Sequence, residues 1–126
     1  AISVGRDRSG ECIGDAMQLT DLMQRHRVDL YLSGHHHAWY PGEVKGQRVL
    51  SLGAMGNGPR RLLGTQRPSD PSLTMLDLFE ATKTVRETTF SLKTLEPISS
   101  DSLPKQLSSK SFPSLDRRDT SWSYGF

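Results

Sequence analysis

Three consecutive histidines, His35, His36 and His37, are the residues of this chain best suited to chemistry. Neutral imidazole is the commonest protein ligand for transition metals, with metal–nitrogen distances of about 2.0–2.1 Å. The histidines follow Gly34, which can turn the backbone where a side chain would obstruct it. Before Gly34, residues 28–33 alternate apolar and polar side chains, which is the period of an extended chain. The pattern predicts a metal-binding turn at the end of a β-strand.

Residues 32–38, Leu-Ser-Gly-His-His-His-Ala, resemble the final Gly-His-x-His motif of the calcineurin-like metallophosphoesterases, the superfamily that includes the purple acid phosphatases. The resemblance implies that His35 and His37 bind different ions of a binuclear centre of Mn, Fe or Zn. It makes Gly34 the turn, and it leaves His36 as a support for the loop or as a solvent-facing residue. The implied activity is hydrolysis of a small-molecule phosphate ester by metal-activated water, as a phosphatase or phosphodiesterase.

The other motifs of this superfamily do not occur in the chain. Asp-x-His, Gly-Asp-x-x-Asp and Gly-Asn-His-Asp/Glu are all missing, and the sequence begins at Ala1. We therefore expect a C-terminal fragment whose carboxylate ligands and general acid lie upstream, and which is inactive by itself. Two alternatives stay open. The chain is a non-catalytic transition-metal-binding module or degenerate relative, or it is a β-rich module whose histidines are incidental.

Arginines are the candidates for contact with a phosphate. Arg60 and Arg61 follow the glycine-rich stretch 53–59, whose three glycines allow a close backbone approach to a metal pocket. Arg6 lies in a polar loop before the first predicted helix, in a region that often borders the substrate in the superfamily. We interpret Arg60, Arg61 and Arg6 as candidate substrate-binding residues, with a solvated surface role as the alternative for each.

The elements that must position these residues alternate between helix and strand. A helix is predicted over 15–27, with Asp15 and Gln18 forming a capping box. The strand over 28–33 follows it. A hairpin is expected over 43–52 with Lys45-Gly46 as its turn, and a second one pairs 73–79 with 85–92. The fold class is α/β, and the resemblance, over residues 15–94, implies the C-terminal portion of an αββα sandwich.

The composition changes near residue 96. Ser, Pro, Lys and Asp dominate beyond that point and apolar residues become isolated, so residues 96–126 are predicted to be a poorly ordered tail behind a domain of residues 1–95. The alternating Trp122, Tyr124 and Phe126 leave another interpretation open, in which they dock as one short strand against a sheet edge.

Composition excludes several partners. The formal net charge is +2, which is too small to indicate nucleic-acid binding by bulk electrostatics. No apolar run approaches the ~20 residues that span a bilayer, and the single cysteine excludes an internal disulfide. No signal peptide is visible in the sequence, and only the family resemblance favours an exported or periplasmic protein.

Overall fold

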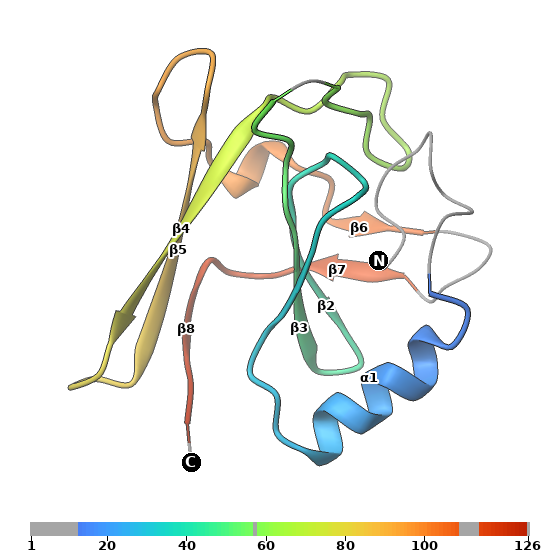
Figure 1. The fold of residues 1–126 in the computed structure, drawn as a ribbon, viewed down its shortest axis with the longest axis vertical. Coiled ribbons are helices and arrows are strands. Elements are labelled where there is room, and N and C mark those ends of the chain that lie inside the picture. Colours follow the sequence, from blue (N-terminus) through green and yellow to red (C-terminus); the bar gives the residue numbers. More distant parts are fainter. Residues whose placement is uncertain (1–12, 57, 109–113, 126) are drawn as a thin grey trace.

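The computed structural model describes residues 13–56, 58–108 and 114–125, which form one helix and two β-sheets (Figure 1). In order these are α1 (Ala16–Arg25), β1 (Tyr31–Ser33), β2 (Tyr40–Val44), β3 (Gln47–Ser51), β4 (Ser72–Phe79), β5 (Thr84–Ser91), the 3-10 helix η2 (Ser100–Ser102), β6 (Gln106–Leu107), β7 (Leu115–Arg117) and β8 (Ser121–Ser123). The sheets have the strand orders β1-β3-β2-β7-β6 and β4-β5-β8. The mixed α/β class is confirmed. Among the described residues no helix is long and apolar enough to cross a membrane.

Helix α1 is shorter than the sequence predicts and starts differently. Asp15 has φ −108° and ψ 30° and makes no side-chain capping bond, so the predicted capping box is wrong. An N-cap side chain normally bonds the first turn from an extended backbone, which Asp15 does not adopt. The helix ends at Arg25 because Arg27 turns left-handed, with φ 54°. The amide of Val28 then donates to the carbonyl of Met23 at 2.9 Å, the bond that closes a Schellman motif.

Strand β1 is the edge of the larger sheet and is parallel to β3, with Leu32 opposite Leu50. It starts at Tyr31 rather than at Val28. Val28 is 40% exposed and Leu32 is 48% exposed, so the apolar alternation predicts the strand but not its burial. Val28 precedes the strand, and Leu32 lies on an edge strand, which has a neighbouring strand on one side only.

Both predicted hairpins are present. Strands β2 and β3 are joined by Lys45 and Gly46, whose φ angles are 48° and 80°. Two consecutive positive φ angles are what a two-residue type I′ hairpin turn requires, and glycine meets this requirement without strain. Strands β4 and β5 pair over their whole length, from Ser72 opposite Ser91 to Phe79 opposite Thr84.

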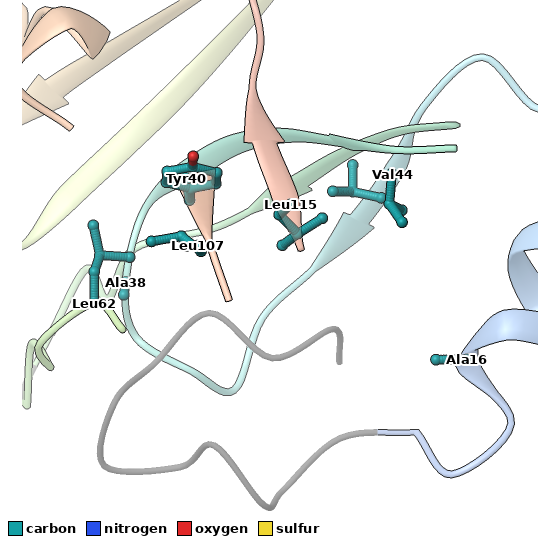
Figure 2. Close-up of a cluster of buried hydrophobic side chains, with 8 residues drawn as sticks. Ala16, Ala38, Tyr40, Val44, Leu62, Leu107 and Leu115 are labelled. Atoms are coloured by element: carbon teal, nitrogen blue, oxygen red, sulfur yellow. The ribbon is translucent and has the colours of Figure 1, made fainter. Parts of the chain in front are cut away.

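The prediction of a poorly ordered tail is wrong for the described residues of 96–126. Strand β7 pairs with β2, and β8 pairs with β5 through Val85 opposite Trp122, so this segment joins both sheets. Leu107 and Leu115 are 2% and 1% exposed and pack in the core beside Tyr40 (Figure 2). These leucines are isolated in sequence, but pairing of β6 with β7 brings them into one cluster. The free energy gained by burying these side chains offsets the entropy lost when the segment becomes ordered, which the composition of the segment does not show.

A buried ion pair fastens the C-terminal segment between the sheets. Arg118 Nη1 lies 2.7 Å from Glu87 Oε1, with side-chain exposures of 6% and 1%. Arg118 also donates to the carbonyls of Gly42 at 2.9 Å and Val49 at 3.1 Å, on the two central strands of the larger sheet. Trp122 Nε1 donates to the same Glu87 oxygen at 2.7 Å. One guanidinium therefore bonds to a carboxylate of the smaller sheet and to two carbonyls of the larger sheet.

Candidate metal-binding loop

The histidine loop leaves the end of β1 in an unusual backbone conformation. His35 and His37 both have left-handed φ angles, 77° and 54°. Non-glycine residues adopt this region infrequently, although His does so more readily than most. Strain of about 1–3 kcal/mol per such residue persists only where the surroundings enforce it, and it is often found at functional sites. The amide of Leu52 donates to the carbonyl of Ser33 at 2.8 Å. This bond joins the start of the loop to the end of β3, the second strand of the hairpin.

Gly34 does not have the role that the motif predicts for it. Its φ is not in the left-handed region, and a Cβ placed on it would meet no heavy atom within 4 Å. The turn is made by His35 and His37 instead. The prediction that Gly34 is the residue that frees the backbone is therefore wrong in its physical reason, while the turn itself lies where it was expected.

Burial divides the three histidines. His35 is exposed, His37 is half-buried and His36 is completely buried. A solvent-facing His36 is therefore excluded. The ring of His36 contacts that of His35 edge-on, with 5.9 Å between the ring centroids and 65° between the planes. His36 therefore supports the loop from inside, while the side chains of His35 and His37 keep solvent-accessible surface.

A hydrogen bond fixes the tautomer of His37. Its Nδ1 lies 2.9 Å from the carbonyl oxygen of Gly58, and because a carbonyl can only accept, Nδ1 is the protonated donor. In the neutral ring Nε2 then carries the lone pair. Metal-binding histidines usually donate their other ring nitrogen to a carbonyl or carboxylate in this way, which fixes the orientation of the ring. Gly58 itself has φ 87°, a conformation that favours glycine.

The candidate arginines differ in their surroundings. The amide of Arg60 donates to the carbonyl of His37 at 3.1 Å, so Arg60 lies directly beside the loop. Its side-chain Nε is buried and has no hydrogen-bond partner in the part of the chain that the structure describes. Arg61 forms an isolated β-bridge with Pro68 and has a further interaction within the molecule. Arg6 lies outside the described residues. Of the two candidate arginines in the described part of the chain, Arg60 is thus placed beside the histidine loop by a backbone bond.

The described residues offer few further metal donors. No group of three or more His, Cys, Asp and Glu side chains among them is arranged to hold a metal ion. A metal ion bound by His35 and His37 would therefore need further ligands from outside the described residues. The fixed tautomer of His37 fits a metal ligand, and the unpartnered Arg60 Nε fits an anion beside it. The donors fit a transition metal, since imidazole suits Zn, Fe and Mn sites that other ligands complete.

Tyr40, three residues beyond His37, joins the histidine loop to the C-terminal segment. This contact is not predicted by the sequence. Its side chain is completely buried and its hydroxyl donates to the carbonyl of Pro104 at 2.9 Å. Burial raises the pKa of Tyr40 to about 12, while the charge of Arg117 lowers it and that of Asp116 raises it by smaller amounts. The only sequence signal for this contact is the aromatic pair after the histidines, which indicates packing without naming a partner.

Comparison with known proteins assigns the chain to no family. No family model, no curated protein and no solved structure matches it. A function can therefore be inferred only from the geometry of residues 34–37, from the glycine-rich segment that contacts them, and from the resemblance of the Gly-His-x-His motif.

Proposed function

We propose that this chain supplies the two histidine ligands, His35 and His37, of a binuclear metal centre that hydrolyses phosphate esters, as in the calcineurin-like metallophosphoesterases. The observation that carries the proposal is the hydrogen bond from His37 Nδ1 to the Gly58 carbonyl, which directs the Nε2 lone pair away from that support. Together with two left-handed histidines in one turn, it is the arrangement expected of metal ligands rather than of incidental surface residues.

Each residue of the loop has a distinct part in this proposal. A bound pair of ions would polarise the phosphoryl oxygen and make a water acidic enough to attack phosphorus at neutral pH. His35 and His37 hold and orient these ions without transferring protons. The Gly58 carbonyl keeps His37 in one tautomer. The remaining ligands and the general acid come from residues that this chain does not contain, so the chain alone is inactive.

Arg60 would neutralise the charge of the phosphoryl group. Its Nε is buried without a partner among the described residues, and a desolvated guanidinium N–H stabilises the fold only when an acceptor reaches it. A phosphate oxygen is such an acceptor, and arginine binds phosphate through strong charge-assisted bonds. The Arg60 amide already lies 3.1 Å from the His37 carbonyl, so a phosphoryl group held at the histidines would be close to this side chain.

The second candidate is a transition-metal-binding module without catalysis. It is favoured by the finding that the described residues contain no third donor close to the two histidines. Two imidazoles leave half of a four-coordinate site to water. Such a module would bind Zn²⁺ weakly, and any phosphate that replaced those waters would not depend on Arg60.

Metal titration tests the ligand assignment. Isothermal calorimetry with Zn²⁺ or Mn²⁺ should show weak binding that His35→Ala and His37→Ala each abolish. The matched control is His26→Ala, which removes an exposed histidine at the end of α1. Equal effects of all three changes, or none, would contradict the assignment.

Phosphate binding separates the two candidates. Inorganic phosphate should bind to the Zn²⁺-loaded chain more tightly than to the metal-free chain, and Arg60→Gln should remove most of that gain. Arg25→Gln, an exposed arginine in the last turn of α1, is the matched control. A gain in phosphate affinity that Arg60→Gln leaves unchanged, or no gain at all, would favour the non-catalytic module.

A further inference from the structure

A hollow of ≈ 410 Å³ opens between the β3–β4 connection and the segment that follows β5. Its apolar lining includes Trp39 and Leu62, which are both 5% exposed, and Ile98 and Leu103 from the segment after β5. The volume is within the range of about 300–1,000 Å³ that small-molecule sites occupy. We call it the Trp39 hollow.

The Trp39 hollow is adjacent to the histidine loop. Trp39 is separated from His37 by one residue. From the other side, the amide of Ser69, which lines the hollow, donates to the carbonyl of Arg60 at 2.9 Å. The Arg60 amide in turn donates to the His37 carbonyl at 3.1 Å. The backbone of Arg60 is therefore hydrogen-bonded on one side to the histidine loop and on the other side to a residue that lines the hollow.

The lining defines the chemistry of an occupant. Apolar surfaces are interspersed with hydroxyl groups, and the charged side chains nearly cancel. Asp70 pairs with Lys93 at 3.6 Å, while Arg67 and Glu96 are exposed and opposite in sign. Such walls favour an uncharged ring that buries apolar surface and accepts a few hydrogen bonds. They give no site for a second phosphate or for a strongly charged group.

We propose that the Trp39 hollow binds the organic leaving group of the phosphate ester, as an uncharged aromatic or heteroaromatic ring, while the phosphoryl group lies at Arg60 and the histidines. This assignment rests on the proposed function for its link to hydrolysis. The substrate class becomes aryl or nucleoside phosphates, and small aliphatic phosphates would leave the hollow empty.

The test uses probes that carry no phosphate and needs no metal. Adenosine and p-nitrophenol are added to the chain in EDTA, and intermolecular NOEs are sought to the methyl groups of Ile98 and Leu103, both of which line the hollow. Filling the hollow by Thr94→Trp should weaken binding by about tenfold or more. Thr82→Trp, at the exposed tip of the β4–β5 hairpin, is the matched control and should leave binding unchanged.

The outcomes separate this proposal from the metal site. NOEs from a ring probe to both methyl groups support the hollow even if Zn²⁺ titrations fail. If one or both residues show no NOE, or if a folded Thr94→Trp variant still binds the probe, the proposal that the hollow binds the ring is wrong. The metal proposal is not affected by that result. If Thr94→Trp does not fold, the NOEs to Ile98 and Leu103 alone decide.

Discussion

Replacement of Arg118 by methionine should destabilise the fold strongly. The change leaves the Glu87 carboxylate, with its side chain 1% exposed, without its counter-charge. Breaking a buried ion pair from one side costs about 3–5 kcal/mol. The carbonyls of Gly42 and Val49 also lose a donor, while Glu87 keeps its bond from Trp122. Because Glu87 Oε2 is buried without a partner among the described residues, the native pair is imperfect, and we expect about 3–4 kcal/mol.

Urea unfolding followed by circular dichroism measures this loss. The matched control is Arg86→Met, because Arg86 and Asp77 lie 3.6 Å apart at an exposed site on the β4–β5 hairpin. Such exposed pairs contribute about 0–1 kcal/mol. The double variant Arg118→Met with Glu87→Leu should recover part of the stability, because no buried charge is left unpaired. If Arg118→Met costs no more than Arg86→Met, the C-terminal segment does not fasten the two sheets.

Four further outcomes follow from the structure. Tyr40→Phe should cost about 1 kcal/mol at neutral pH, from its lost bond to Pro104. Because burial raises the pKa of Tyr40 from 10.0 to about 12, the free energy of unfolding should not depend on this group below about pH 10 and should fall by about 2–3 kcal/mol as the pH rises to 12. Urea titrations of the Phe variant should not show this fall. Gly58→Ala, at φ 87°, should lower Zn²⁺ affinity in calorimetry by about 10–100-fold because it displaces the carbonyl that supports His37. With Mn²⁺ the purified chain should hydrolyse p-nitrophenyl phosphate no faster than Mn²⁺ alone, and faster turnover would show a complete centre. In hydrogen exchange, the amides of Arg118 and Tyr124 should be protected because they donate to the carbonyls of Pro41 and Lys83. Fast exchange at both amides would show that the C-terminal segment is disordered.

Local features of the fold could be predicted from the sequence. The Lys45-Gly46 turn is indicated by a glycine, which accepts positive φ, between two strand-like segments, so its place was predictable. The paired lengths of β4 and β5 follow from their own alternation. The place of the histidine turn was predictable for the same reason, since a strand ending before Gly34 puts the next residues in a loop.

Features that depend on distant residues could not be predicted. The Arg118–Glu87 pair joins positions 31 residues apart in the sequence, and the bond to Gly42 spans 76. Neither residue type indicates a partner. Composition made 96–126 appear disordered because Leu107 and Leu115 are isolated, yet both are buried once β7 pairs with β2 and β6 pairs with β7.

The candidate site shows the same division. The residue types in 35–37 indicate metal binding, but the direction of each ring depends on the φ angles of His35 and His37, which no periodicity specifies. The sequence also does not show that His36 is buried, and the carbonyl that His37 contacts belongs to Gly58, 21 residues further along the chain. Sequence reasoning could therefore propose the ligands, and only the fold could show what orients them.

The most direct test of the central claim is the imidazole nitrogen NMR spectrum of the chain during a Zn²⁺ titration. We predict that Zn²⁺ shifts the ring-nitrogen signals of His35 and His37. The metal should bind His37 Nε2, and the proton should stay on Nδ1, where it is donated to the Gly58 carbonyl. The signals of His26, exposed at the end of α1, should stay unchanged. Zn²⁺ on His37 Nδ1, or shifts at His26 without shifts at His35 and His37, would contradict it.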